Sequence, residues 1–370
     1  MAIFGDMSMM KKDLFIYGTG LTAKHAYELV NDSDKYGTIT FLNRTLDQYN
    51  CVSDYGDCWL YTDKRITEQM KQENDVIVAI MNTMGDIRGV MRNLADAGFS
   101  HIIPYAKLAD IFPDKFSFLY LEDSVNFMKR MPQIEQARKI LEDTCADQRS
   151  MQVFESMVNF RKTKNYNFLP EIDKKDNQYF PRDILKYRTD NISFVDCGAY
   201  IGDTFEALLK YANDVKANVS CYTGFEPDKD NFKKFEDKLE NEKNTKYTLY
   251  PYAVCDRAKE LYFDMLGTTA SKVENNIQTS IHVKGIAMDD IEFSQVPTHI
   301  KMDIEGEERN ALIGAQNLIR TYKPKLAICI YHKPEDIYDI INLIHAWNLG
   351  YRFEMRVYED VGIDLVLYAI

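Results

Sequence analysis

The chain has 370 residues, of which 45% are hydrophobic and 28% are charged, and its formal net charge is -12. This length and composition indicate a globular protein of two domains, each able to bury its own core, without the roughly 20 consecutive apolar residues of a membrane span. The acidic balance argues against a nucleic-acid substrate, because such a polyanion is bound by basic surfaces.

Two further features narrow the class of protein. The first residues lack the apolar run and the small-residue cleavage site of a signal peptide, so we expect a cytoplasmic protein. The seven cysteines include no Cys-x-x-Cys pair, so we expect neither a zinc site nor a disulfide framework.

The first predicted element is an apolar strand at residues 14–17, which runs into the glycine turn GTGLTA at residues 18–23 and then a helix. Further strands are predicted at residues 38–42, 75–81 and 100–104, with a helix between the last two. This alternation predicts a small, parallel, Rossmann-like α/β domain over residues 1–110.

The glycine turn leaves two interpretations open. Either it binds a nucleotide, or the domain serves packing or dimerisation and makes the protein a homo-oligomer. Asn43 stands where a dinucleotide-binding domain carries its ribose-binding acid, and it binds a hydroxyl less well. The glycine turn, the strand VIVAIMN and the segment GFSHIIPYA resemble the N-terminal domain of bacterial sugar-modifying acetyltransferases over residues 13–106. This resemblance implies a sugar-nucleotide or partner-binding role.

Residues 111–185 are predicted to form a helical connector. Apolar residues recur at helical spacing over residues 134–145 and 151–158, which predicts two helices joined near residues 146–149. The segment QYFP follows at residues 178–181. Its Tyr179 or Phe180 either covers a cofactor or packs against the next domain.

The stretch SFVDCGAYIGDT at residues 193–204 organises a second α/β domain, predicted over residues 186–370. Its apolar strand ends on Asp196, and Gly198 and Gly202 permit close backbone approach. Asp203 and Thr204 suit the first turn of a helix. A carboxylate at the strand end repels phosphate and attracts an ammonium group, which favours S-adenosylmethionine over a dinucleotide.

Later strands of this domain also end on polar residues, and open parallel sheets bind ligands beyond such ends. Glu226, followed by Pro227, ends the strand at residues 219–225 and suits both hydroxyls of a ribose. In a third strand, at residues 248–254, Val254 offers an apolar face for adenine and Asp256 a hydrogen-bonding partner, with a plain strand end as the alternative. Short strands are expected at residues 261–263 and 281–284, and the polar residues 267–279 between them are long enough for a substrate loop.

Two more strands place the candidate catalytic residues at the same edge. Asp303 and Glu305 lie at the end of the strand at residues 299–304, and His332 follows the strand at residues 326–330. Histidine titrates near neutral pH, which makes His332 the first candidate for the proton acceptor and Asp303 its rival. Asp303 and Glu305 alternatively hold Mg²⁺, although we expect no metal. Apolar runs at residues 351–357 and 363–368 predict a hairpin that adds an antiparallel strand.

Six ordered segments resemble the FkbM-type S-adenosylmethionine-dependent methyltransferases over residues 178–370: SFVDCGAYIGDTF, GFEPDKDNF, PYAVCDR, HIKMDIEGEE, PKLAICIYHKPEDI and DLVLYAI. The resemblance implies a seven-stranded class I fold and methylation of a hydroxyl, often on a sugar, glycan or natural product. It also implies that residues 196–203, which include Ala199 and Tyr200, bind the cofactor together with Glu226. Asp303, Glu305 and His332 would lie on the reaction side, with Asp303 also at the cofactor. One departure is Arg356-Val357-Tyr358, where the family often has Arg-His-Tyr.

Two rival functions stay open beside this hypothesis. An NAD-dependent sugar-nucleotide oxidoreductase would use the N-terminal domain, but Asn43 and the lack of a fitting Tyr-x-x-x-Lys pair speak against it. A non-catalytic scaffold would retain the cofactor fold without turnover. The leading hypothesis is an O-methyltransferase that uses S-adenosylmethionine and acts on a small molecule or glycan.

Overall fold

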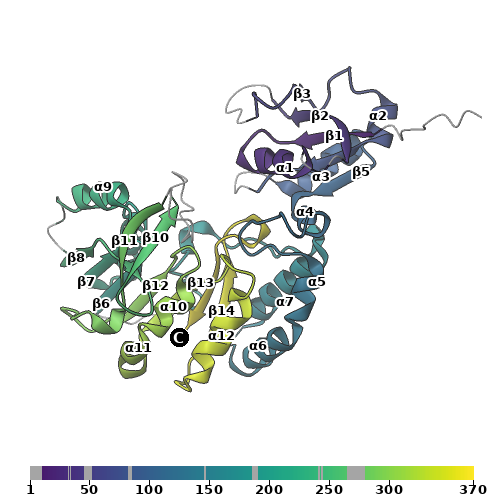
Figure 1. The fold of residues 1–370 in the computed structure, drawn as a ribbon. Coiled ribbons are helices and arrows are strands. Elements are labelled where there is room, and N and C mark those ends of the chain that lie inside the picture. Colours follow the sequence, from purple (N-terminus) through teal and green to yellow (C-terminus); the bar gives the residue numbers. More distant parts are fainter. Residues whose placement is uncertain are drawn as a thin grey trace, which may run out of the picture. The chain divides into compact units, whose positions relative to one another are not determined.

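The computed structural model describes residues 11–31, 33, 35–45, 52–81, 86–145, 147–185, 191–240, 242, 245–264 and 280–370. The chain divides into two compact units (Figure 1). The N-terminal unit consists of Met1–Met128 and Met157–Leu169, and the C-terminal unit of Lys129–Ser156 and Pro170–Ile370. Residues 111–185 contribute to both units, and the three-part division expected from the sequence stays a prediction. The expected substrate loop at residues 267–279 lies outside the described residues.

A parallel sheet with the strand order β3-β2-β1-β4-β5 forms the centre of the N-terminal unit. Its central strand β1 ends in the continuous, buried apolar run of residues 14–17, as expected for a strand covered on both faces. The predicted alternation of strands and helices is confirmed. The strands are β1 (Lys12–Tyr17), β2 (Tyr36–Asn43), β3 (Cys58–Leu60), β4 (Asp75–Val78) and β5 (His101–Pro104), and the helices are α1 (Leu21–Asn31), α2 (Glu68–Glu73), α3 (Ile87–Asp96), α4 (Leu108–Ile111) and α5 (Ser124–Lys129).

Two long helices, α6 (Met131–Thr144) and α7 (Gln148–Thr163), follow where the sequence predicts them. Helix α6 buries Ile134, Ala137, Ile140 and Leu141, the apolar face expected from helical spacing. This face packs against α12 (Asp336–Ala346) and strand β14 (Phe353–Val357) within the C-terminal unit. Helix α7 begins in the C-terminal unit and ends in the N-terminal unit.

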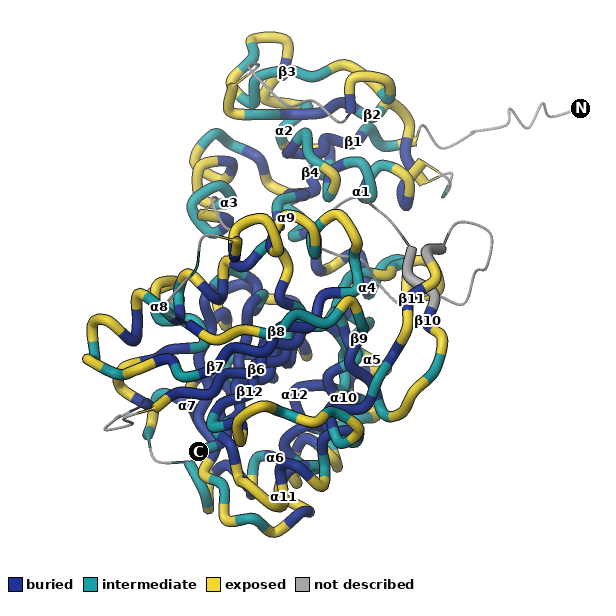
Figure 2. Tube along the Cα trace, turned by 90° about the vertical axis from the view of Figure 1, so that its left-hand side faces the viewer, coloured by how far each residue is buried: buried dark blue, intermediate teal, exposed yellow. Residues whose placement is uncertain are grey.

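The C-terminal unit is built on a seven-stranded sheet with the order β14-β15-β13-β12-β6-β7-β8. Strand β15 runs antiparallel to both neighbours, which confirms the hairpin expected near the end of the chain, and the other pairs are parallel. Figure 2 shows the central strands β6, β7 and β12 in the dark blue of buried residues. The remaining strands are β6 (Asn191–Cys197), β7 (Asn218–Phe225), β8 (Tyr247–Tyr250), β12 (His299–Met302), β13 (Lys325–Cys329) and β15 (Leu365–Ala369).

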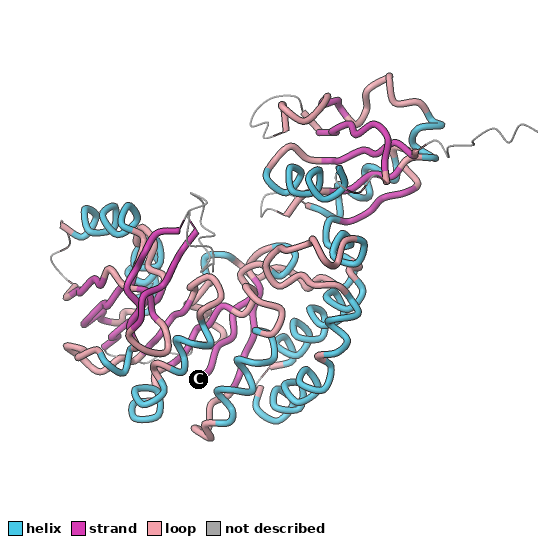
Figure 3. Tube along the Cα trace, viewed as in Figure 1, coloured by secondary structure: helices cyan, strands magenta, loops and turns pink. Residues whose placement is uncertain are grey.

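Helices alternate with the strands of this sheet and flank it, as the cyan and magenta segments of Figure 3 show. These helices are α8 (Asp203–Val215), α9 (Lys229–Leu239), α10 (Glu308–Ile313), α11 (Gln316–Tyr322) and α12. Short 3₁₀ helices lie at Tyr105–Lys107, Tyr166–Phe168, Lys175–Asn177, Met288–Asp290 and Asp360–Gly362. The described part of the C-terminal unit is therefore a doubly wound α/β domain.

The prediction of a single strand at residues 248–254 is wrong. The structure has two strands there, β8 and β9 (Ala253–Val254), separated by Pro251. Proline has no N–H to donate to a strand ladder, so the pairing with β7 stops before it. Strand β9 pairs instead with β11 (Ser280–Ile286), which also pairs with β10 (Lys259–Asp264). Strands β10 and β11 confirm the short strands expected on either side of the polar loop.

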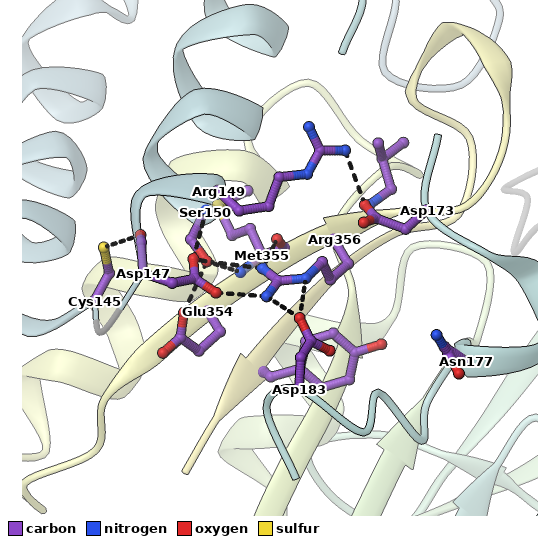
Figure 4. Close-up of polar contacts among 12 residues, drawn as sticks. Cys145, Asp147, Arg149, Ser150, Asp173, Asn177, Asp183, Glu354, Met355 and Arg356 are labelled. Atoms are coloured by element: carbon purple, nitrogen blue, oxygen red, sulfur yellow. Dashed lines mark hydrogen bonds and ion pairs between the residues drawn. The ribbon is translucent and has the colours of Figure 1, made fainter. Parts of the chain in front are cut away.

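A buried guanidinium joins the segments around α6 and α7 to strand β14 (Figure 4). The Arg356 side chain lies 2.5 Å from a carboxylate oxygen of Asp147 and 2.5 Å from one of Asp183. Its second nitrogen donates to the hydroxyl of Ser150, which in turn donates to Glu354. Val357, which stands where the resembled family often has histidine, is fully covered in the same strand. The network therefore fixes the helical segment to the sheet edge.

Candidate active site

The glycine loop after β6 is held so tightly that two positions require glycine. Gly198 has φ +80°, and a Cβ atom there would lie 2.0 Å from the carbonyl oxygen of Asp303. Gly202 has φ +85°, and its Cβ would lie 2.3 Å from the ring of Phe235. Only glycine combines these left-handed angles with such close approach. The loop therefore lies directly on the end of β12.

Asp196 lies inside β6 and already contacts an ammonium group of the protein. Its Oδ1 is 3.0 Å from Nζ of Lys301, the residue beside it on β12, and its Oδ2 accepts from the hydroxyl of Tyr222 at 2.6 Å. Burial lowers the pKa of Lys301, but the charges of Asp196 and Asp303 outweigh it and raise that pKa overall. Lys301 also donates to the carbonyl of Gly198 at 2.7 Å. The contact of Asp196 with a cofactor stays a prediction.

Glu226 stands at the end of β7 with an environment suited to a ligand diol. Its Oε2 accepts from the backbone N–H of Tyr200 and its Oε1 from that of Asp228, both at 2.8 Å. Burial raises the pKa of Glu226 to about 7, against the lowering effect of the two N–H groups. A carboxylate has about four lone-pair positions, so two remain for further donors. The position fits the expected ribose-binding role.

The other expected cofactor residues surround this loop within one unit. Ala199 is buried and Tyr200 is exposed, and both lie in the turn between β6 and α8. Asp203 and Thr204 form the first turn of α8, the former exposed and the latter buried. Pro227 is half-buried after Glu226, and Val254 is buried in β9. Asp256 forms ion pairs with Lys259 and Arg257.

Asp303, Glu305 and His332, the expected reaction-side residues, come together as predicted from their strand ends. His332 Nε2 lies 3.4 Å from Oδ1 of Asp303 and 3.7 Å from Oε2 of Glu305. Burial lowers the pKa of His332, but the carboxylates of Glu308, Asp303 and Glu305 outweigh it and raise the pKa to about 10. Burial raises the pKa of Asp303, but Lys301 and His332 outweigh it, so this carboxyl is ionised.

Four residues that the sequence did not single out for the site complete this cluster. Tyr331 donates to Asp303 Oδ1 at 3.3 Å, and Glu308 Oε1 lies 2.9 Å from Nδ1 of His332. Lys301 and Tyr222 hold Asp196 from the neighbouring strands. The sequence did indicate a partner for a buried acid, because Lys301 lies within the apolar run HIKMDI and a cation in a buried strand needs an opposite charge.

Tyr179 lies at the reaction-side cluster. Its hydroxyl donates to Asp303 Oδ2 at 2.8 Å, and its ring lies 5.2 Å from Nζ of Lys301. Tyr179, Tyr200 and Glu305 all have φ between +47° and +65°, a region that costs a non-glycine residue of order 1–3 kcal/mol. Such backbone strain clusters at functional sites. A cavity of about 570 Å³ adjoins Tyr179, Asp203 and Thr204, although it reaches neither Glu226 nor His332.

The sheet order, with one reversed strand beside the edge and a glycine loop after its central strand, defines a class I methyltransferase fold. Residues 196–353 match the family model of the methyltransferase FkbM domain. This match confirms the resemblance to FkbM-type methyltransferases that the sequence motifs of the C-terminal unit indicate. This family implies S-adenosylmethionine as the cofactor.

Among solved structures, the crystal structure of methyltransferase FkbM from Methylobacillus flagellatus KT is similar over 98% of this chain and 92% of its own, with 20% identity and a TM-score of 0.77. It shows the fold. A rRNA methylase from Streptococcus thermophilus has 12% identity and a TM-score of 0.29, over 49% of this chain and 86% of its own. Aeropyrum pernix fibrillarin with natively bound S-adenosyl-L-methionine has 10% identity and a TM-score of 0.29, over 49% and 67%.

A search of curated proteins finds no match to the chain. None of the helices in the described ranges has the length and apolar character needed to cross a membrane. The resemblance of residues 13–106 to sugar acetyltransferase domains stays a prediction. In that unit, Asn43 donates through its side-chain amide to the hydroxyl of Thr19 at 3.3 Å.

Proposed function

We propose that the protein is an S-adenosylmethionine-dependent O-methyltransferase that acts on a hydroxyl of a sugar, glycan or related small molecule. One observation carries the proposal. The carboxylate of Glu226, which has lone pairs left for two further donors, and the ionised carboxylate of Asp303 lie at the same edge of the sheet, and the Gly198 loop contacts the ends of both of their strands. A cofactor and an acceptor therefore have neighbouring polar groups at the place where such sheets bind ligands.

The chain's own residues supply binding and orientation on the cofactor side. Glu226 accepts hydrogen bonds from the ribose hydroxyls, and Val254 contributes an apolar surface for the base. Lys301 keeps the carbonyl of Gly198 fixed, which holds the loop in its binding conformation. When bound, S-adenosylmethionine supplies an electrophilic methyl group.

Proton removal from the acceptor falls to Asp303 rather than to His332. The Asp303 side chain is 23% exposed and ionised, whereas the His332 side chain is 2% exposed and lies among three carboxylates that hold its proton. Asp303 is nevertheless a weak base, because its pKa is lowered. Orientation of the two reactants, which contributes roughly 7–11 kcal/mol in well-positioned reactions, therefore dominates the rate.

Calorimetric titration of the full chain with S-adenosylhomocysteine tests the cofactor site. We expect one-to-one binding that weakens about 10- to 100-fold in Glu226→Ala, because hydrogen bonds to a charged group contribute about 1.5–3 kcal/mol. Asp230→Ala, a change of an exposed acid in the first turn of α9, is the matched control and leaves binding unchanged. Absence of binding to the folded wild-type protein contradicts the proposal.

Transfer of an isotopically labelled methyl group to hydroxylated acceptors then tests the reaction. Sugars, glycans and nucleotide-linked sugars are compared with acceptors whose hydroxyl is replaced by hydrogen. Label recovered on an amine or thiol, and never on a hydroxyl, contradicts O-methylation. The cytoplasmic location and a homo-oligomer formed through the N-terminal unit stay predictions.

A further inference from the structure

Glu308 is a fully buried carboxylate in the first turn of α10, and it contacts two parts of the reaction side. Its Oε1 accepts from the backbone N–H of Ile304 at 2.8 Å and lies 2.9 Å from Nδ1 of His332, whose ring is buried as well. One oxygen atom therefore joins the turn of residues 303–306, which follows β12, to the segment that follows β13.

The turn after β12 has a backbone that needs such support. Glu305 has φ +57° and Gly306 has φ +98°, so two successive residues lie in the left-handed region. This conformation costs a residue such as Glu305 of order 1–3 kcal/mol and persists only where the surrounding contacts enforce it. The hydrogen bond from Ile304 to Glu308 is one such contact. Packing is another, because a Cβ atom at Gly306 would lie 3.5 Å from that of His332.

The His332 ring connects Glu308 to Asp303. The second ring nitrogen, Nε2, lies 3.4 Å from Oδ1 of Asp303. The ring also packs on Tyr331, with the two centroids 4.1 Å apart, and the Tyr331 hydroxyl donates to the same Asp303 oxygen at 3.3 Å. The position of the His332 ring therefore limits where this carboxylate oxygen lies.

The contact between Glu308 and His332 acts through charge rather than through a directed hydrogen bond. Neither ring nitrogen, nor Oε2 of Glu308, has a partner with hydrogen-bond geometry among the residues that the structure describes. Burial lowers the pKa of His332, but the surrounding acids, Glu308 foremost, raise it overall, so a buried cation faces a buried anion. Such a pair is often no more stabilising than apolar residues of similar volume. Stability alone therefore does not explain Glu308.

We propose that Glu308 is a positioning residue, which holds His332 and the turn after β12 against each other and thereby orients the Asp303 carboxylate toward the acceptor. The inference rests on the proposed function, in which Asp303 takes the proton of the acceptor hydroxyl. Orientation matters at this step, because a misplacement of about 1 Å can lower a rate about 100-fold. Glu308 and His332 need no contact with a ligand for this role, which agrees with their burial.

Glu308→Gln separates positioning from a purely structural role. The amide oxygen of glutamine still accepts from the Ile304 N–H, so the turn keeps its hydrogen bond, while the charge that faces His332 is lost. Methyl transfer by the full chain is measured on a hydroxylated acceptor that takes up the labelled methyl group. We expect kcat to fall roughly 10- to 100-fold, with KM and the affinity for S-adenosylhomocysteine unchanged. Glu307→Gln is the matched control, because this neighbouring acid faces Lys333 and its loss leaves kcat unchanged.

Nitrogen-15 nuclear magnetic resonance of the histidine rings gives a reading that needs no acceptor. The chain has six histidines, and His332→Gln identifies the signals of His332. We expect the wild-type ring to stay protonated through neutral pH, because its pKa is raised. In Glu308→Gln we expect this pKa to fall, although Asp303, Glu305 and Asp336 still face the ring.

A double variant gives a second measurement of the same effect. Glu308→Gln with His332→Gln removes both charges, so it leaves no buried ion unpaired if one of the single variants fails to fold. We expect it to lose as much kcat as Glu308→Gln does, because the two residues act as one unit. Circular dichroism verifies that each variant is folded.

Three results overturn the inference: a wild-type kcat in folded Glu308→Gln or in the double variant, an affinity for S-adenosylhomocysteine that falls as much as kcat, or a pKa of His332 that is the same in the wild type and in Glu308→Gln. Methyl transfer to a hydroxyl with kcat unchanged in these variants refutes only this inference. If no hydroxylated acceptor takes up the label, the proposed function fails, and the pKa of His332 in Glu308→Gln then decides whether Glu308 holds the ring.

Discussion

Replacing Lys301 by methionine removes one half of a fully buried ion pair. The side chains of Lys301 and Asp196 are 3% and 0% exposed, and the ammonium group also holds the Gly198 carbonyl. After the change, the Asp196 carboxylate keeps the hydroxyl of Tyr222 as its hydrogen-bond donor but loses its counter-charge. Breaking a buried pair in this way typically costs about 3–5 kcal/mol. We expect Lys301→Met to destabilise the C-terminal unit by that amount.

The chain's two tryptophans make the measurement specific to one unit. Trp59 belongs to the N-terminal unit and Trp347 to the C-terminal unit. In a Trp59→Phe background, urea unfolding followed by fluorescence therefore reports on the C-terminal unit alone. We expect the midpoint to fall in Lys301→Met and the affinity for S-adenosylhomocysteine to fall with it, because Gly198 loses its anchor.

A double variant separates the charge effect from a loss of packing. Asp196→Asn with Lys301→Met removes both charges while retaining similar volumes, so we expect it to be more stable than Lys301→Met alone by roughly 1–3 kcal/mol. The reasoning is refuted if Lys301→Met costs less than about 1 kcal/mol. It is refuted equally if the double variant is no more stable than the single one.

Three further predictions concern the cofactor loop and the reaction side. Because Glu226 has a raised pKa of about 7, its carboxylate is neutralised as the pH falls below that value. We therefore expect calorimetry to show that S-adenosylhomocysteine binding weakens from pH 8 to pH 6 in the wild type and does not change with pH in Glu226→Gln. A wild-type affinity that is also independent of pH contradicts this role. Gly198→Ala places a Cβ atom against the Asp303 carbonyl, and we expect this variant to lose cofactor binding. The control Gly350→Ala, at a glycine with a similar φ and no atom within 4 Å of the added Cβ, retains cofactor binding. Equal losses of cofactor affinity in the two variants would assign the loss to backbone conformation alone. Tyr179→Phe removes a hydrogen bond to Asp303, and we expect methyl transfer to slow about 10- to 100-fold with cofactor affinity retained; a loss confined to cofactor affinity contradicts this assignment.

Much of the site follows from the sequence because parallel strands bring their carboxyl ends to one edge. An apolar run followed by Glu226, Asp303 or His332 was sufficient to place each residue there. The contacts of Asp196 could not be predicted in the same way. Its pairing with Lys301 depends on the register between β6 and β12, which are separated by about a hundred residues in the chain. Glu308 lies five residues after Asp303 in the sequence, and only the fold reveals that it is buried against His332.

The sequence-based prediction of one strand at residues 248–254 failed for a different reason. Pro251 lies within an apolar run that otherwise reads as one strand, and this proline, which has no N–H group for a strand ladder, was the signal in the sequence against a continuous strand. The chain leaves the main sheet at this position and enters the small sheet with its next strand, β9. Val254 consequently belongs to the small sheet with β11 rather than to the main one.

The close approach of Gly198 to Asp303 limits how such an enzyme can diversify. Under the proposed function, the residue whose backbone supports the cofactor loop also carries the carboxylate that faces the acceptor, so a change at either position would disturb both ligands. We expect a lineage that acquires new acceptors to keep this pair and to vary residues that contact neither member. The charged lining of the adjoining cavity, at Lys174, Arg182 and Lys210, offers such positions. Directed evolution of acceptor preference is best begun there.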